Sequence, residues 1–480
     1  PTNNYDFKED GLLQARGGWY FYNDLKVDTP VENLFIYKDA SKINHYIAST
    51  GKDLFDFSYL NSTKLTIPLT LTDFDKRGFI SQNNLLFIGD GVNPNIKYNG
   101  KEIKIAGITR PTAQIQVDSI VVGGNLSPGK YKYRYTYYSD TTYWNLLESE
   151  ANLNYTELQT VSTSQIILNN ISISSNNSTT KRRIWRTKNT GIEEYYLLGT
   201  IDNNTDTYFT DNLNDTQLSS VKLDLTQGRE PLPPSKIFTE YKGYVFSTGN
   251  STYPSRLYWS GLYLPEYHNT EFDYWEEPDR QTITGIAKTN GHLIIFTKNK
   301  TYSLFIPNET FTDFSTWYIT LINNAVGCIE ASSIANIGGQ DAGIAFASNQ
   351  GIYGLGVNLY NNFVNNSVSG GTFDYFGINV RDDYNKYIKK YPNLLKAFFN
   401  DHKYYLSYST NGVYNDKILI FNTTARSWSK YSGIYSNSFM YDIENDVLLS
   451  GSSLNDGKII RLDGGNLYDG NLAMDYNKII

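Results

Sequence analysis

Cysteine is almost missing from this sequence, since Cys328 is the only one in 480 residues. No intrachain disulfide can form, so packing and strand pairing must hold the fold together. Histidine is also rare, and its four copies lie far apart, without an HxxxH pattern: His45, His268, His292 and His402. We expect each to be an ordinary surface or half-buried polar residue, and we expect no metal site and no cofactor.

Long apolar runs are absent too. No segment approaches the roughly 20 apolar residues of a transmembrane helix, and the polar start PTNNYDFKED is not a signal peptide. The chain begins with Pro1 rather than Met, so we expect the numbering to start inside a longer or trimmed chain. Strong charge is lacking as well. A formal net charge of -7, spread along the sequence, argues against a protein that binds nucleic acid by neutralising phosphates, although DNA can still pass nearby.

Motifs for common chemistry are missing. Neither a GxxxxGK[ST] phosphate loop nor a GxSxG nucleophile elbow occurs, which leaves nucleotide hydrolysis and α/β-hydrolase chemistry without support. Two acidic turns, GDGVNPN (Gly89 to Asn95) and DGGNLYDGN (Asp463 to Asn471), offer oxygen ligands for calcium. Neither has EF-hand spacing, so ordinary turn chemistry explains both.

Aromatic and turn-forming residues are abundant in the sequence. The chain holds 41 Tyr, 24 Phe and 37 Gly, together with many Asn, Asp and Ser residues. Aromatic and β-branched side chains suit pleated surfaces, and the small polar residues suit tight turns. This composition predicts an all-β protein with many hairpins and little helix.

A hairpin pattern recurs along the chain, with an apolar strand, a polar turn and a second strand in each copy. The copies are Asn33 to Ile47, Asn84 to Gly100, Gly243 to Ser260, Gly291 to Phe305, Gly343 to Gly356, Leu395 to Tyr408 and Asp446 to Asp463. A period of about 50 residues is typical of β-propeller blades. Terminal strands can complete a shared blade, so we expect a propeller of six to eight blades.

The hairpins that start at Asn84 and Gly243 are separated by about three repeat periods, which predicts an inserted module. Several strand patterns within about 100 residues, without an immunoglobulin cysteine pair, favour a β-sandwich of the immunoglobulin or fibronectin type III kind. The proline-rich Arg229 to Lys236 marks the return to the main domain, since consecutive prolines stiffen linkers. We therefore divide the chain into 1–109 (first part of the propeller), 110–226 (inserted sandwich) and 227–480 (remainder of the propeller).

Two stretches of the sandwich carry charged and aromatic residues together. Tyr131, Tyr133, Tyr135 and Tyr137 alternate with Lys130, Lys132, Arg134 and Thr136, which predicts one aromatic face and one solvated face. The run KRRIWRTK, Lys181 to Lys188, resembles a nucleic-acid stacking patch. We favour an ordinary strand there, with Ile184 and Trp185 on opposite faces and the charged residues at its edges.

The richest acidic stretch is EFDYWEEPDR, which contains Glu271, Asp273, Glu276, Glu277 and Asp279 beside two aromatic residues. A glycosidase needs two carboxylates at a defined separation with sugar-stacking aromatics nearby. The stretch supplies these residue types, but the Ser-x-Asp-x-Gly-x-x-Trp repeat of sialidases is absent, and carboxylates in a polar loop are the commoner case. A carbohydrate-active propeller, glycosidase or lectin, stays open as an alternative, and a propeller that acts as an intracellular interaction scaffold is a third option.

The segment from Pro233 carries a family resemblance. PPSKIFTEYKGYVFSTGNSTYPSRLYWSG, PDRQTITGIAKTNGHLIIFTKNKTYSL and NNAVGCIEASSIANIGGQDAGIAFASNQGIYGL follow one another in the order found in tail nozzle (tail hub, or stabilisation) proteins of short-tailed bacteriophages. DGLLQARGG, Asp10 to Gly18, is similar to an early segment of that family, and the inserted sandwich looks like the fibronectin-like insertion of relatives. The resemblance is strongest between Pro231 and Gly356.

The resemblance implies a structural virion protein rather than an enzyme. Its members form a ring, expected here to be a homohexamer, that extends the DNA ejection channel below the portal and adaptor and docks fibres, spikes or a plug. DNA passes through without specific binding, so no nucleic-acid contact residue is assigned. Six copies at -7 each would carry about -42, which suits a conduit along which DNA slides.

Overall fold

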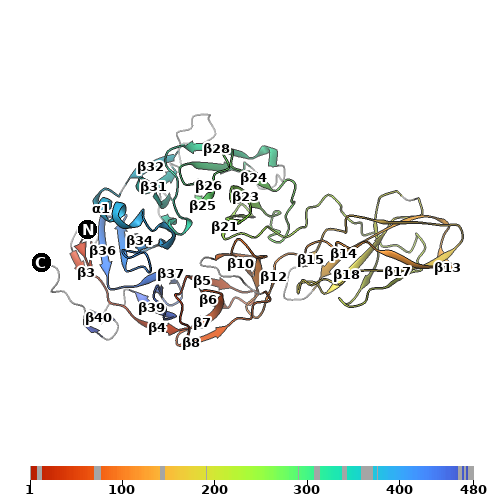
Figure 1. Cartoon of the computed structure of the whole chain (residues 1–480), viewed down its shortest axis with the longest axis horizontal. Coiled ribbons are helices and arrows are strands. Elements are labelled where there is room, and N and C mark those ends of the chain that lie inside the picture. The colour runs from red at the N-terminus through yellow and green to blue at the C-terminus, as the bar shows by residue number, and fades with distance from the viewer. Residues whose placement is uncertain are drawn as a thin grey trace.

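The computed structural model describes residues 2–7, 13–69, 77–140, 146–190, 192–289, 291–307, 314–337, 343–357, 371–375, 377–462, 468–469 and 472–473. Its main body is a closed ring of β-sheets, and a second β module projects from one side of the ring (Figure 1). The described elements are strands with a few short helices, so the all-β prediction is confirmed.

Seven four-stranded antiparallel sheets, the blades, form the ring in the part of the chain that is described. Blade 1 contains β5 (Asn33–Lys38), β6 (Asn44–Thr50), β7 (Asp53–Ser58) and β8 (Asn61–Lys64), and blade 2 contains β9 (Gly78–Gln82), β10 (Leu85–Gly89), β11 (Ile96–Tyr98) and β12 (Ile103–Ile105). Blade 3 contains β21 (Ile237–Tyr241), β22 (Tyr244–Thr248), β23 (Arg256–Trp259) and β24 (Tyr274–Glu276), and blade 4 contains β25 (Ile283–Thr289), β26 (His292–Thr297), β27 (Thr301–Phe305) and β28 (Tyr318–Asn323).

The last three blades follow the same plan. Blade 5 contains β29 (Ala335–Ile337), β30 (Gly343–Ser348), β31 (Gly351–Val357) and β32 (Gly371–Tyr375), and blade 6 contains β33 (Lys396–Asn400), β34 (Lys403–Tyr408), β35 (Lys417–Asn422) and β36 (Ser427–Ser432). Blade 7 contains β37 (Ser436–Asp442), β38 (Val447–Ser452), β39 (Lys458–Leu462) and β4 (Tyr20–Asp24). Each of the seven hairpins found in the sequence lies in a different blade.

The first strands of the blades form the inner wall of the ring. β5, β9, β21, β25, β29, β33 and β37 each contact the first strands of the two neighbouring blades, and this circuit closes. Apolar side chains fill the seams between blades: one cluster joins blades 1 and 7 around Leu34 and Leu449, and another joins blades 4 and 5 around Phe296 and Phe346. The ring is therefore a seven-bladed propeller.

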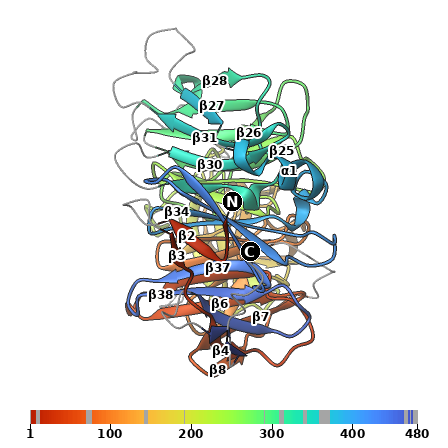
Figure 2. The ribbon, with the colours of Figure 1, turned by 90° about the vertical axis from the view of Figure 1, so that its left-hand side faces the viewer.

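The ring closes by joining the two ends of the propeller in one sheet. β4 pairs with β39, with Asp24 opposite Lys458 and Tyr20 opposite Arg461. Asn23 extends this joint into blade 1, because its Nδ2 donates to the carbonyl oxygens of Ser58 (2.6 Å) and Asn61 (2.8 Å). Figure 2 shows β4 close to β7 and β8 at the edge of the ring. A strand from the start of the chain thus completes the last blade.

The remaining strands near the ends lie outside this joint. β1 (Thr2–Asn3) adds to the outer edge of blade 6 by parallel pairing with β36, and β2 (Tyr5–Phe7) and β3 (Leu13–Ala15) pair with each other. β40 (Tyr468–Asp469) and β41 (Leu472–Ala473) form a two-residue pair. β3 lies across the ring from the projecting module (Figure 1).

The projecting module, here called the arm, leaves the ring after β12 and returns before β21. One sheet contains β13 (Gln116–Leu126), β17 (Ser164–Asn169) and β20 (Phe209–Asp211), and the other contains β14 (Gly129–Ser139), β15 (Leu147–Glu148), β16 (Thr156–Thr160), β18 (Lys181–Arg186) and β19 (Tyr196–Ile201). Residues of both sheets share one apolar core. The arm is the inserted β-sandwich.

Short helices fill two connections of the ring. η3 (Ile378–Val380), α1 (Arg381–Asp383), η4 (Tyr384–Ile388) and η5 (Pro392–Leu394) follow one another between β32 and β33, and η1 (Phe314–Thr316) and η2 (Ala331–Ser333) precede β28 and β29. Val380, Tyr384 and Ile388 are buried in the core that blades 5 and 6 share. These helices thus cover the seam between the two blades.

Candidate functional site

The acidic stretch EFDYWEEPDR is bound into the seam between blades 3 and 4. Glu277 is buried, accepts a hydrogen bond from Tyr302 Oη (2.6 Å) and lies 3.4 Å from Lys300 Nζ. Lys300 also pairs with Asp279. Lys300, which follows the turn between β26 and β27, therefore anchors this loop to blade 4.

The neighbouring carboxylates have other local partners. Glu276 lies 3.5 Å from the guanidinium of Arg256, its opposite residue in β23. Asp273 accepts a hydrogen bond from the backbone of Asn269 (2.6 Å), and burial raises its pKa to about 6. Glu271 is exposed, and no member of the acidic stretch lines the large cavities at the centre of the ring described below. The five carboxylates thus do not converge on a shared substrate cavity there.

The basic run KRRIWRTK lies mainly in β18, at the centre of the arm. Arg182 and Arg186 are fully buried, so the prediction that the charged residues lie at the strand edges is wrong for these two. Arg182, Ile184 and Arg186 are spaced two residues apart in β18, so their side chains share the face of the strand that points to the core. Trp185 lies on the opposite face. Arg186 binds Asp211 at 2.8 Å, where both side chains are inaccessible to solvent, and Tyr133 Oη donates to the same carboxylate (2.6 Å).

The other positively charged residues of β18 also have carboxylate partners. Lys181 pairs with Asp140 (2.9 Å) and Asp202 (3.0 Å), and Arg183 pairs with Glu148 (3.0 Å). The Arg183 guanidinium lies over the Tyr138 ring at 3.6 Å. These cations serve the arm internally, and the geometry gives no support to a nucleic-acid stacking patch.

The tyrosine ladder of β14 forms the predicted aromatic core face. Tyr131, Tyr133 and Tyr135 are fully buried and Tyr137 nearly so. The opposite face is not the solvated face that the alternation predicts, since Thr136 and Lys132 are buried. Thr136 accepts a hydrogen bond from Trp185 Nε1 (3.0 Å) and donates to Glu148 (2.6 Å), so a second polar and aromatic layer covers this face.

The histidines and the cysteine occupy separate places. His45 lies between Asp56 (Nδ1 to Oδ2, 2.5 Å) and Asp39 (Nε2 to Oδ2, 3.5 Å), and the hydrogen bond to Asp56 is the main cause of its raised pKa. Burial lowers the pKa of His268 and of His292 to about 4. His402 lies in the turn between β33 and β34, and burial raises the pKa of Cys328 to about 12. Over the described ranges, no group of three or more His, Cys, Asp or Glu residues is arranged to hold a metal ion.

The first of the two acidic turns has a structural role. Asp90 accepts hydrogen bonds from the backbone N–H groups of Val92 (2.9 Å) and Asn93 (2.8 Å) and from the Asn93 side chain (3.1 Å). This is the ordinary turn chemistry expected from the sequence. The second turn, Asp463 to Asn471, lies almost wholly outside the described residues.

A network of charged and polar groups fixes the arm to the ring. Arg110, at the exit from blade 2, binds Glu230 on the returning segment (Nε to Oε1, 2.6 Å) and Glu150 of the arm. A second contact lies at the edge of blade 2, where Ile105 donates its backbone N–H to Asn177 (2.9 Å) and accepts from Ser178 Oγ (2.6 Å). Further contacts join the arm to the ring, since the backbone N–H of Glu148 donates to Tyr267 Oη (3.0 Å) and Asn176 donates to the Gly107 carbonyl oxygen (2.8 Å).

A wide opening of the ring lies where the inner strands begin. Two adjoining cavities of about 510 and 550 Å³ share five lining residues, and together their walls contain residues of six blades and of η2, which precedes blade 5. The shared residues are Asp90, Val92, Lys236, Glu330 and Lys396. We call this opening the axial mouth, and it is the strongest candidate site in the described structure because it combines volume, converging loops and charge.

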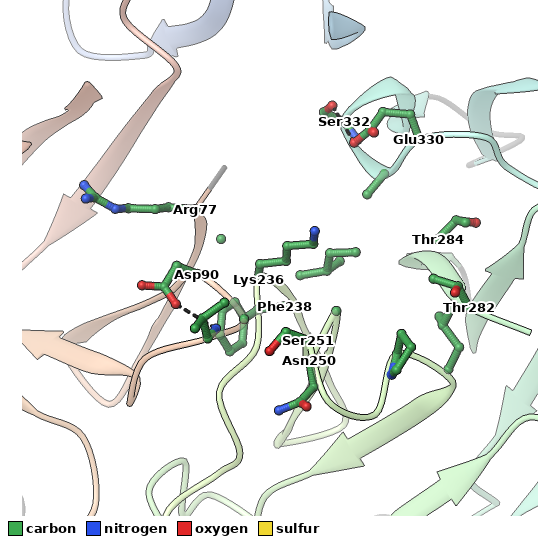
Figure 3. A pocket seen from close by; sticks show the side chains of 18 of the residues that line it. Arg77, Asp90, Lys236, Phe238, Asn250, Ser251, Thr282, Thr284, Glu330 and Ser332 are labelled. Atoms are coloured by element: carbon green, nitrogen blue, oxygen red, sulfur yellow. Dashed lines mark hydrogen bonds between the residues drawn. The ribbon is translucent and has the colours of Figure 1, made fainter. Parts of the chain in front are cut away.

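Lys236 crosses the axial mouth (Figure 3). It directly precedes β21, and its stem runs beside Gly249, where an added Cβ would lie 2.7 Å from Lys236 Cγ. Gly249 has a φ of 77°, which favours glycine. The Lys236 side chain is exposed, and within the described residues its ammonium has neither an ion pair nor a hydrogen bond.

The acidic groups around Lys236 are engaged elsewhere. Asp90 caps its own turn, as described above, and Glu330 accepts hydrogen bonds from the backbone N–H and the hydroxyl group of Ser332 (3.4 and 3.0 Å). Lys396 donates to the carbonyl oxygen of Glu32 (3.0 Å). The ammonium of Lys236 therefore offers hydrogen-bond donors that neither Asp90 nor Glu330 accepts.

Sequence reasoning missed this site. Lys236 ends the proline-rich segment interpreted as a return linker, and the residues that line the mouth are separated by up to about 420 positions along the chain. The available signal was positional, since a charged residue immediately before the first strand of a blade lies at the axial end of that blade. Glu32, Arg77 and Lys236 all occupy this position.

Comparisons with known proteins leave the family open. No protein-family model matches the sequence, and no curated protein matches it. Among solved structures, BBS1N in complex with ARL6DN soaked with lead is 8% identical, with 93% of this chain and 97% of that chain covered and a TM-score of 0.31. Virginiamycin B lyase from Staphylococcus aureus is 12% identical (69% and 99% covered, TM-score 0.30), and YCF48 from Cyanidioschyzon merolae is 10% identical (94% and 100% covered, TM-score 0.31).

These similarities are too low to bear on function, and the propeller assignment depends on the strand order described above. In the described part of the chain, helices long and apolar enough to span a membrane are absent.

Proposed function

We propose that this chain is a structural subunit of a bacteriophage tail nozzle. In this proposal six copies form a ring that extends the DNA ejection channel, bind the adaptor and portal assembly at one end, and carry fibres, spikes or a plug. The order of sequence segments from Pro233 onward motivates the proposal, and the resemblance also implies a virion location. No catalytic role is part of it.

The observation that carries the proposal is the fixed arm with an edge strand, β13, whose outer side has no partner strand among the described residues. β13 is a terminal strand of its three-stranded sheet and lies at the end of the arm farthest from the ring (Figure 1). Exposed edge strands are usually protected by lysine, proline or short length. β13 is 11 residues long and contains neither lysine nor proline.

The surface at the arm tip is apolar as well. Val122 is 73% exposed and Val161, in the adjacent loop, is 90% exposed, while Ile120 and Val121 are about half exposed. A protein that remained a monomer would expose these groups to aggregation. The occupant that we assign to this edge is the next copy of the chain, because a patch on a projecting arm that meets a different surface of its neighbour builds a ring when the rotation closes.

The test is the assembly state of the full chain. Negative-stain images and mass photometry of the recombinant protein, and images of purified tails, should show closed rings. Val122→Lys should reduce the ring population at least tenfold, since it places a charge in the apolar contact. Ile443→Lys, at an 81% exposed site in blade 7, is the matched control and should leave assembly unchanged.

Two results would overturn the proposal. The first is a chain that stays a dispersed monomer and is absent from virions. The second is a ring that forms equally well with Val122→Lys, which would remove the arm tip from the contact even if rings exist.

A further inference from the structure

We propose that the axial mouth is a binding site for a peptide segment that carries one carboxylate beside an apolar residue, with Lys236 as the carboxylate partner. This inference concerns a surface that the nozzle proposal does not use, and it stands whether or not the chain forms a ring.

The first argument is the surplus of donors at the mouth. The carboxylates of Asp90 and Glu330 already accept local hydrogen bonds, whereas the ammonium of Lys236 is exposed with no partner in the described structure. A ligand that enters the mouth must therefore bring acceptors, and a carboxylate forms strong, charge-assisted hydrogen bonds with lysine.

The second argument sets the number of negative charges. Three cationic residues line or border the mouth (Arg77, Lys236 and Lys396), and three acidic residues accompany them (Glu32, Asp90 and Glu330). Because the formal charges balance, the fixed carboxylates repel a polyanion such as a nucleic-acid backbone. One carboxylate that pairs with Lys236 leaves a formal charge of only -1 at the mouth, whereas a polyanion would leave a larger negative charge, so the site suits a single acidic group.

The third argument concerns the apolar part of the ligand. Val92 and Val413, which line the same cavity as Lys236, are 51% and 76% exposed, and Tyr414 lies beside them in that wall. These apolar groups lie around Lys236, and contact with an apolar group of a ligand would remove them from water. Cavities of about 510 and 550 Å³ are large enough for several side chains. A short acidic and apolar segment of a protein fits both features.

The experiment is a calorimetric titration of the full chain with four probes. They are the peptide acetyl-Gly-Ser-Leu-Glu-Gly-Ser-amide, its counterpart with Gln in place of Glu, sodium acetate and inorganic phosphate. We expect the Glu peptide to bind at least about tenfold more tightly than the Gln peptide, because the difference isolates the contact between carboxylate and lysine.

Variants locate the site. Lys236→Gln should weaken binding of the Glu peptide about tenfold, and Lys236→Arg should retain most of it because the charge stays. Lys298→Gln is the control, since Lys298 is an exposed lysine in the turn between β26 and β27 of blade 4 that does not line the mouth. Lys236 is exposed, so these variants should unfold at the temperature of the parent protein.

The outcomes separate cleanly. Tighter binding of the Glu peptide than of acetate supports a peptide segment over a free carboxylate. Equal binding of the Glu and Gln peptides, equal binding by Lys236→Gln and the parent, or binding of phosphate alone would each overturn the proposal.

Discussion

Single side chains in this molecule are positioned by partners that are distant in sequence. Arg186 is the clearest case, because a guanidinium that looked like part of a surface patch lies in the arm core against Asp211. Burial is the largest single influence and opposes its charge, but Asp211, Tyr133 and Asp215 together outweigh burial and raise the pKa of Arg186. Removing either Arg186 or Asp211 would leave the other charge buried without compensation, so the arm core requires both residues.

His45 provides a prediction at the same scale. Asp56 and Asp39 raise its pKa above the ordinary value of 6.5, so the folded protein holds the proton more tightly than the unfolded chain. The stabilisation is complete below about pH 6.5 and is lost as the pH rises through the raised pKa. We expect His45→Gln to lower the free energy of unfolding at pH 5.5, with a difference from the parent that shrinks as the pH increases.

Urea titrations between pH 5.5 and 9 measure this difference. His268→Gln is the contrasting control. Burial lowers the pKa of His268 to about 4, so its contribution should be present above pH 6.5 and decline as the pH falls. A His45→Gln effect that does not change with pH would contradict the prediction.

At the scale of elements, the strand that matters most is β4. It supplies the fourth strand of blade 7, and Asn23 connects it to blade 1 through two hydrogen bonds. We expect Asn23→Ala to lower the free energy of unfolding by about 1–3 kcal/mol, because each buried hydrogen bond contributes about 0.5–1.5 kcal/mol net. Chemical denaturation followed by circular dichroism measures the change.

Asn23→Asp tests the same joint. It keeps the shape of the side chain but replaces the donor with an acceptor that faces two carbonyl oxygens, so it should destabilise at least as much as Asn23→Ala. If both variants were as stable as the parent, the joint would not stabilise the ring.

Many of the strands and hairpins could be predicted from the sequence. Seven hairpins such as Gly291 to Phe305 were visible because each pairs residues adjacent in the chain, and turn chemistry marks them. The number of blades could not be predicted from the sequence, because the pairing of β4 with β39 joins segments more than 400 residues apart and depends on the closure of the ring. Lys236 was missed for the same reason, since the axial mouth exists only when loops from distant segments converge.

At the scale of the whole molecule, the orientation of the arm is the property most open to experiment. Glu230 binds Arg110 at the base of the arm, and Glu150 completes this contact. We expect Glu230→Gln to broaden the distribution of arm positions, because it removes a charged partner from the joint while the contacts at Ile105 remain. Small-angle X-ray scattering should show an altered distance distribution at its long end.

Glu271→Gln, at an exposed carboxylate of blade 3, is the control and should leave the scattering unchanged. An unaltered curve for Glu230→Gln would mean that the remaining contacts at the base, such as those at Ile105 and Tyr267, are enough to hold the arm. A subunit whose arm swings freely would also meet its neighbours at variable angles, so this measurement bears on ring closure.

The pairing of β4 with β39 also sets an order of events during synthesis. The segment that completes blade 7 leaves the ribosome early, yet its partner strand emerges only after more than 430 further residues. Until then the nascent ring is open, and the inner edges of its first and last finished blades have no neighbour. Closure is therefore a late, long-range step of folding, and an interruption of translation before Leu462 leaves an incomplete ring with two apolar seams exposed to other chains.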